Sequence, residues 1–274
     1  MGNVIPITLL KLGGSLITNK DKRLSLNNDA LKGIAGAIAR SGLPSVRRRL
    51  IIVHGGGSFG HYYAKKFGLT VERKFVAPLE ISKTSGSMMQ LHSIVLKTLV
   101  RSGVAAETIM AQELISSRNL MNENGLGRVR RALEQNLVPV SFGNVGFSGT
   151  SAYIISGDAV CEAIFFSMPV DRLIFAMDVD GLYPSAKLKG NVLRILTEKD
   201  EIETAARKFD VTGGIQSKIS LGFRVARAGA EVFYVNGKKP KRLLKLLRSA
   251  DSSKVRATVI MRSKKRELAI FSAS

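Results

Sequence analysis

Short apolar runs rich in branched side chains alternate along this chain with segments whose apolar residues recur every three or four positions. The first pattern predicts buried strands, and the second predicts amphipathic helices. The expected strands are residues 5–12, 50–53, 138–142, 153–155, 173–177, 231–235, 258–261 and 268–271. The expected helices are one closed by Gly42, a short one that ends at Gly68, and residues 82–102, 128–136, 159–166, 197–208, 215–228 and 240–248.

Strands that alternate with helices in this way predict an α/β fold with a mostly parallel sheet covered on both faces. Residues 143–157 are rich in loop-forming residues and are expected to form a hairpin. The 274 residues contain no evident linker or internal repeat. We therefore expect one compact domain with two lobes, of about residues 1–165 and 166–274.

Glycine turns follow several of the expected strands, and each has a lysine or a histidine nearby. They comprise Lys11 with Gly13 and Gly14, the glycines from Gly55 to Gly60 with His61, and Gly213 and Gly214 with Lys218; Lys20 lies just beyond the first turn. Free N–H groups and the helix dipole at a strand–glycine–helix junction favour an anion. Such turns gather at the carboxyl ends of parallel strands. Cations and amides around two anion pockets suit phosphoryl transfer.

Other glycine-loop chemistries fit less well. Gly55, Gly57 and Gly60 match G-x-G-x-x-G, but this dinucleotide signature needs a second strand that ends in an acid about twenty residues later. The sequence there is VERKFVAPLEIS, which Pro78 interrupts. The P-loop pattern G-x-x-x-x-G-K-[ST] and the protein-kinase patterns H-R-D and D-F-G are missing from the chain.

Composition adds one rival function. The chain has 42 Lys and Arg against 21 Asp and Glu, a formal charge of +21, which raises the possibility of nucleic-acid binding. The basic residues are spread along the chain, Trp is absent and aromatic residues make up only 6%, so stacking platforms are scarce. We expect a generally basic surface and no nucleic-acid partner.

Cellular location follows from what the sequence lacks. No apolar run reaches the length of a membrane span, and no cleavable leader is evident at the N-terminus. The single cysteine, Cys161, lies in an apolar run and is expected in the core. These features predict a cytoplasmic protein with no membrane partner.

Five motifs occur in a characteristic order between Lys11 and Lys218: K-L-G-G-S, H-G-G-G-S-F-G-H, I-S-G-D, D-V-D-G-L-Y and V-T-G-G-x-x-x-K. Together they resemble the amino acid kinase superfamily and, within it, the archaeal-type isopentenyl phosphate kinases. The final histidine of the second motif, His61, is the discriminating residue. The resemblance implies an open three-layer αβα sandwich, a homodimer, and transfer of the ATP γ-phosphate to isopentenyl phosphate in isoprenoid biosynthesis.

The resemblance also implies roles for individual residues. The ATP-binding residues would be Lys11, Gly13, Gly14, Ser15, Gly57, Asp178, Gly181, Tyr183, Gly214 and Lys218. The substrate phosphate would be held by Gly56, Gly60, His61 and Gly157. The catalytic set would be His61, Lys11, Lys20, Asp158 and Lys218, with Asp158 orienting the lysines by ion pairing. Mg²⁺ would be held mainly by ATP oxygens and water, so no protein metal ligand is expected.

Physical chemistry restricts what His61 would do. The attacking phosphate oxygen is already ionised at neutral pH, so a general base is unnecessary. A histidine that donates a hydrogen bond can position that phosphate and offset the repulsion between two anions. The organic tail of the substrate would lie against apolar side chains of residues 82–99, including Met88 and Met89.

Two departures from the family pattern bear on the substrate. Ala159 stands where the family has a second aspartate, and Asn144 stands where it has an aspartate. One alternative is therefore another small-molecule kinase of the same fold, acting on a phosphonate or phosphate such as fosfomycin. An alternative of a different class is a regulator that binds nucleic acid or a metabolite.

Overall fold

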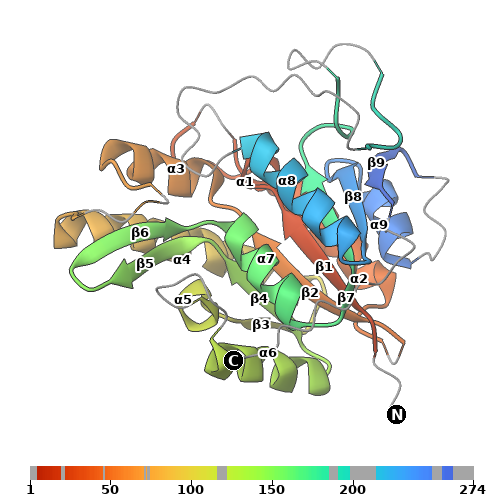
Figure 1. Ribbon diagram of the computed structural model, residues 1–274, viewed down its shortest axis with the longest axis horizontal. Coiled ribbons are helices and arrows are strands. Elements are labelled where there is room, and N and C mark those ends of the chain that lie inside the picture. Colours follow the sequence, from red (N-terminus) through yellow and green to blue (C-terminus); the bar gives the residue numbers. More distant parts are fainter. Residues whose placement is uncertain are drawn as a thin grey trace.

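The computed structural model describes residues 5–19, 22–45, 47–70, 72, 75–115, 122–184, 191–197, 214–248 and 255–261. The strands of its central sheet are β1 (Ile7–Leu12), β2 (Arg49–His54), β3 (Ala106–Thr108), β4 (Val138–Phe142), β7 (Val170–Met177), β8 (Glu231–Asn236) and β9 (Ala257–Ile260). They lie in the order β3-β4-β2-β1-β7-β8-β9 (Figure 1). Neighbouring strands are parallel except β8 and β9. A separate antiparallel hairpin comprises β5 (Asn144–Ser148) and β6 (Ser151–Ile155).

Helices cover both faces of this sheet. They are α1 (Gly14–Ile17), α2 (Asn28–Ser41), α3 (Gly57–Lys66), α4 (Pro78–Arg101), α5 (Ala111–Leu114), α6 (Glu123–Glu134), α7 (Gly157–Ser167), α8 (Gly214–Arg227) and α9 (Pro240–Arg248). One core contains side chains of α5, α6, α7 and α8, and a second contains side chains of α1, α2, α4 and α9. Leu9 and Leu10 are adjacent in β1 and lie in different cores, because successive strand side chains point to opposite faces. The expected three-layer α/β sandwich is confirmed.

Most expected elements are present, and their differences from the structure have physical causes. Helix α4 begins at Pro78, earlier than expected, because a proline without an N–H is well suited to a first helical turn. Helix α6 begins at Glu123 rather than residue 128, since Asn122 caps it and its early glycines masked the pattern. The short elements β3, α1 and α5 were not expected. The strand predicted over 268–271 and nearly all of the helix predicted over 197–208 lie outside the described residues.

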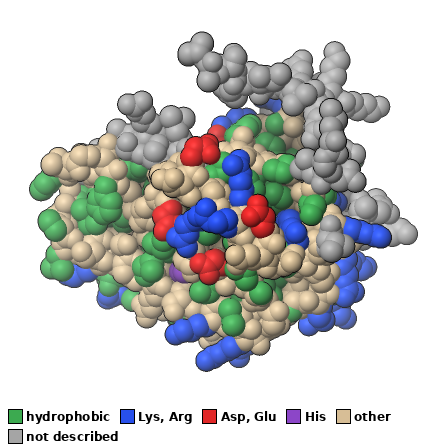
Figure 2. Space-filling model, turned by 90° about the horizontal axis from the view of Figure 1, so that it is seen from below, with side chains coloured by type: hydrophobic (Ala, Val, Ile, Leu, Met, Phe, Trp, Pro, Cys, Tyr) green, Lys and Arg blue, Asp and Glu red, His purple; other side chains and the backbone are tan. Residues whose placement is uncertain are grey.

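The central sheet continues across the expected lobe boundary near residue 165, and the division into two lobes stays a prediction. Among the described helices, none is long and apolar enough to cross a membrane. On the face drawn in Figure 2, Lys and Arg side chains lie near the middle and along the lower and right-hand edges, and Asp and Glu side chains lie among those near the middle. A generally basic surface remains our interpretation of the net charge.

The ends of β1 and β2 bring two glycine turns into contact. The N–H of Gly55 donates to the carbonyl of Leu12 at 2.9 Å. A Cβ on Gly14 would lie 2.2 Å from the backbone nitrogen of Gly57. Gly57 itself has φ +49°, and a Cβ there would lie 2.0 Å from Thr18 Oγ1. Only glycine permits this approach of backbone to backbone, which places both turns at one edge of the sheet.

This contact predicts opposite effects of two glycine-to-alanine changes. Gly57→Ala should lower the free energy of unfolding by at least about 2 kcal/mol, because a side chain there meets backbone at a strained φ. Gly86→Ala is the control: Gly86 lies in α4 with no atom within 4 Å of an added Cβ. It should raise stability by about 0.5–1 kcal/mol. Urea unfolding measures both, and a Gly57→Ala protein as stable as the parent would contradict the close approach.

Candidate active site

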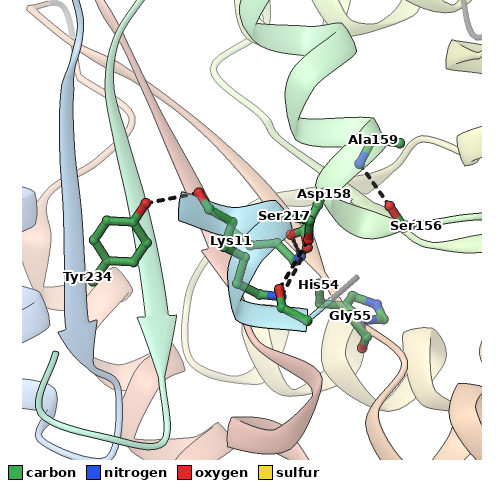
Figure 3. Close-up of polar contacts among 10 residues, drawn as sticks. Lys11, His54, Gly55, Ser156, Asp158, Ala159, Ser217 and Tyr234 are labelled. Atoms are coloured by element: carbon green, nitrogen blue, oxygen red, sulfur yellow. Dashed lines mark hydrogen bonds and ion pairs between the residues drawn. The ribbon is translucent and has the colours of Figure 1, made fainter. Parts of the chain in front are cut away.

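A buried carboxylate joins two lysines at the carboxyl end of the central sheet. Lys11, near the end of β1, forms an ion pair with Asp158 Oδ1 although only 4% of the lysine is exposed (Figure 3). Lys218, in the second turn of α8, reaches the other oxygen of Asp158 at 3.0 Å. Residues separated by more than 200 positions in the chain are thus held on one carboxylate. The ion pairing of Asp158 that the family resemblance implied is present in the structure.

The electrostatics keep this cluster charged. Burial alone would raise the pKa of Asp158, but Lys11 and Lys218 lower it to about 2. Burial opposes the charge of Lys11 as well, yet Asp158, with a smaller contribution from Cys161, raises the Lys11 pKa above its ordinary value. Two lysines and one aspartate leave an excess positive charge in a largely buried place. Such a place favours an anion that can approach it.

The N-cap and first turn of α7 hold Asp158 in position. Ser156 caps the helix by accepting a hydrogen bond from the Ala159 N–H at 3.0 Å. A Cβ on Gly157 would lie 3.1 Å from Lys11 Cε and 3.1 Å from the carbonyl of His54, so the first residue of α7 packs closely against the ends of both strands. These contacts place Asp158 between β1 and α8.

The two family departures have distinct surroundings. Ala159 packs against the apolar core of that face, where a second carboxylate would be unfavourable. Asn144 is buried, and its Oδ1 accepts the Val145 N–H at 2.9 Å. Its side-chain Nδ2 has no protein partner among the described residues. Neither residue lies in the lysine–aspartate cluster.

Helix α8 is held in place from the sheet. Tyr234 in β8 donates its hydroxyl to the carbonyl of Lys218 at 2.9 Å (Figure 3). The ammonium of Lys218 also donates to the carbonyl of Gly214 at 3.0 Å, and Gly214 has φ +55° at the start of the helix. Lys218 therefore has little freedom to leave Asp158. The predicted residues Lys20 and Gly213 lie outside the described residues.

Residues 178–183, which follow β7 and were predicted to bind the nucleotide, form two parts with different contacts. Asp178 accepts a hydrogen bond from Ser15 Oγ at 3.2 Å, which joins this segment to the first glycine turn. Gly181 instead packs against β9, since a Cβ there would lie 2.7 Å from Thr258 Oγ1. Tyr183 is half-buried. This packing gives Gly181 a structural reason to be glycine, and the ATP-binding roles of Asp178, Gly181 and Tyr183 stay predictions.

The second glycine turn, residues 55–60, leads into α3 and packs against Met88. A Cβ on Gly56 would lie 2.8 Å from Met88 Sδ, and one on Gly60 would lie 2.9 Å from it. Met88 is buried behind the turn, whereas Met89 is 41% exposed. His61 follows the turn within α3, and its side chain is exposed. The loop thus has a fixed apolar support and an accessible histidine beside it.

His92, on α4, has two polar side-chain contacts. His92 Nδ1 lies 3.1 Å from His54 Nε2, and His92 Nε2 lies 2.9 Å from Thr108 Oγ1. Both imidazole rings stack with Phe142. Burial, with a smaller effect of its histidine neighbour, lowers the pKa of His54 to about 3, and burial lowers that of His92 to about 4. The sequence offered only that His54 directly precedes the glycine turn and that His92 lies one helical turn after Met88.

Comparison with known proteins agrees with this architecture. Residues 6–236 match the amino acid kinase family, and the chain belongs to that family. Isopentenyl phosphate kinase of Methanocaldococcus jannaschii is 29% identical over 256 residues, which cover 88% of this chain and 95% of the relative. That of Haloferax volcanii is 30% identical over 222 residues, covering 78% and 86%. A product complex of the T. acidophilum isopentenyl phosphate kinase aligns with a TM-score of 0.74 at 25% identity, covering 93% of this chain and 99% of that one.

The lysine–aspartate cluster predicts a large stability cost when its carboxylate is removed. Asp158→Asn leaves Lys11 buried without a counter-charge and should lower the free energy of unfolding by about 3–5 kcal/mol. The control is Asp171→Asn, which breaks a more exposed pair with Arg48 and should cost about 1 kcal/mol or less. Urea unfolding at neutral pH compares them. Similar losses in the two variants would contradict a buried, charge-dependent cluster.

The buried histidines predict a loss of stability in mild acid. Their folded pKa values lie below the ordinary value near 6.5, so the unfolded chain binds more protons once the pH falls below that value. Each histidine should therefore cost about 1 kcal/mol between neutral pH and about pH 5.5. Unfolding in urea across this range measures the slope. His92→Gln should reduce it, and an unchanged slope in His92→Gln would contradict the neutral buried pair.

Proposed function

We propose that this protein transfers the γ-phosphoryl group of ATP to isopentenyl phosphate, producing isopentenyl diphosphate and ADP. The observation that carries the proposal is the pairing of Asp158 with Lys11 and Lys218 beside two touching glycine turns. The similarity to isopentenyl phosphate kinases over most of the chain supports the choice of acceptor.

The proposed reaction needs positioning and charge stabilisation more than proton transfer. A phosphate oxygen of isopentenyl phosphate attacks the γ-phosphorus, while the bond from that phosphorus to the β–γ bridging oxygen breaks. The attacking oxygen is already ionised, and Asp158, with a pKa of about 2, is unsuited to accept a proton. The lysines would instead offset charge on the transferring group. Lys20, by the family resemblance, would join them.

The first glycine turn would serve the nucleotide in this proposal, and the second would serve the acceptor phosphate, except for Gly57, which would face ATP. Gly13, Gly14 and Ser15, with Gly57 and Gly214, would lie along the ATP phosphates. Gly56, Gly60 and His61 would hold the acceptor phosphate, His61 by donating a hydrogen bond, and Gly157 would add an amide on the same side. The accessible position of His61 beside the turn that Met88 supports is consistent with this role.

Magnesium would enter the site with the nucleotide. Mg²⁺ dehydrates reluctantly and is commonly carried by phosphate oxygens and water, where it neutralises charge on the phosphates. Asp158 is a poor candidate for a ligand because both of its oxygens accept hydrogen bonds from lysines. The donor set around the cluster therefore suits phosphate oxygens better than a bare cation. We also expect a homodimer, as the family resemblance implies, and a cytoplasmic location, as the sequence predicts.

A panel of acceptors tests the proposed function directly. ADP formation is measured in a coupled assay with isopentenyl phosphate, dimethylallyl phosphate, fosfomycin, acetylglutamate and UMP. We expect the highest kcat/KM with isopentenyl phosphate. Activity only with acetylglutamate or UMP would refute the assignment, and salt-sensitive binding to nucleic acid without ATP turnover would favour a regulator instead.

Variants of His61 test its role as a hydrogen-bond donor. His61→Ala should lower kcat/KM for isopentenyl phosphate by about 10²–10³-fold, as expected for loss of a positioning donor in an active site. His61→Gln retains a donor and should keep more activity. Lys66→Ala, on the same helix with an exposed side chain, is the control and should behave as the parent. Equal losses in the two His61 variants would contradict positioning by donation.

A further inference from the structure

A line of hydrogen bonds runs from the edge of the sheet to the second glycine turn. It begins at Thr108 in β3, whose Oγ1 lies 2.9 Å from His92 Nε2. It continues from His92 Nδ1 to His54 Nε2 at 3.1 Å, and from His54 Nδ1 to the carbonyl of Gly55 at 3.2 Å. Phe142 stacks on both rings, with ring centroids 5.3 Å from that of His54 and 4.1 Å from that of His92. The line therefore consists of groups that packing holds in place.

Only one direction of donation satisfies every member of this line. A carbonyl oxygen can only accept, so His54 carries its proton on Nδ1 and its Nε2 accepts. His92 must then carry its proton on Nδ1, and its Nε2 accepts from the Thr108 hydroxyl. Both rings are neutral because burial lowers their pKa values, and the nearby charge of Lys11 further disfavours a charged His54. These tautomers leave His92 Nε2 as an acceptor, and the line is complete only while the Thr108 hydroxyl donates to it.

The end of the line fixes the orientation of a peptide group in the glycine turn. In a trans peptide the carbonyl and the following N–H point in opposite directions. Because the Gly55 carbonyl points to the His54 ring, the Gly56 N–H points away from the buried rings. Among the described residues, this N–H has no backbone acceptor. Glycine imposes little conformational preference of its own, so an external contact is needed to hold the peptide.

We infer that Thr108, His92 and His54 are positioning residues for the acceptor phosphate, holding the Gly55–Gly56 peptide with its N–H turned toward the anion. This role rests on the proposed function, because the acceptor phosphate is the anion that the second glycine turn would hold. The three residues act through the backbone of Gly55 and need not touch the substrate. Helix α4 contributes twice to this turn, since it carries both His92 and the Met88 that packs against Gly56 and Gly60.

The tautomers provide a test that needs no substrate. Two-bond ¹⁵N–¹H correlation spectra of uniformly ¹⁵N-labelled protein near neutral pH should show two neutral histidines protonated at Nδ1. Thr108→Val should change the tautomer pattern and move the Gly56 amide resonance, whereas Thr108→Ser retains the hydroxyl and should preserve both. A parent protein with His54 protonated at Nε2 would overturn the inference.

Kinetics then test the positioning role. Thr108→Val should raise KM for isopentenyl phosphate by about tenfold, the effect of losing one well-placed hydrogen bond, with KM for ATP changed by less than about twofold. Thr108→Ser should restore the parent value. His92→Phe removes the middle donor with a ring that can still stack, and it should give the same selective effect.

Thr98→Val is the matched control for the loss of a threonine hydroxyl. Thr98 lies on α4, and its Oγ1 bonds to the carbonyl of Ile94, outside the line. The inference would be overturned if Thr98→Val and Thr108→Val changed the KM for isopentenyl phosphate equally. It would also be overturned if Thr108→Val changed the KM values for isopentenyl phosphate and ATP equally. If the parent protein fails to phosphorylate isopentenyl phosphate, the proposed function is wrong. The histidine tautomers and the Gly56 amide resonance still test whether the line of hydrogen bonds orients the Gly55–Gly56 peptide.

Discussion

The arrangement of this site depends on one buried carboxylate that must be paired. Asp158 is almost removed from solvent, and its charge is tolerable only because Lys11 and Lys218 approach it from two other elements. That requirement brings the ends of β1, α7 and α8 to one point. Gly157 fits the same constraint, since a Cβ there would lie 3.1 Å from Lys11 Cε. Pairing leaves a net positive charge at the mouth of the turns, where phosphates would gather.

The proposed acceptor side depends on packing rather than on charge. Met88 fills the space behind Gly56 and Gly60, and the neutral pair of His54 and His92 lies beneath the start of the same turn. Both supports come from α4 and the sheet, so a flexible glycine sequence acquires a fixed shape. The proposed nucleotide side, by contrast, is joined by the hydrogen bond from Ser15 to Asp178. A charged centre between two shaped turns is what transfer between two phosphates requires.

The fold was largely predictable because its strands are continuous apolar runs and its helices carry clear apolar stripes. Local sequence patterns failed where tertiary contacts determine the secondary structure. β3 has only three residues, all half-buried, and glycines obscured the start of α6. The pairing of Lys11 with Asp158 joins positions 147 apart and came only from the family resemblance. The contact between His54 and His92 had no sequence signal of its own, since neither residue's neighbours reveal which strand and helix will pack together.

The central claim is that the paired lysines face the transferring phosphate between two glycine turns. A crystal structure with a non-hydrolysable ATP analogue, Mg²⁺ and isopentenyl phosphate would measure this most directly. The account predicts terminal phosphate oxygens of the nucleotide within hydrogen-bonding distance of Lys11 and Lys218, and the acceptor phosphate on the Gly56 amide beside His61. An acceptor phosphate bound away from the second glycine turn, or a nucleotide whose phosphates avoid both lysines, would contradict it.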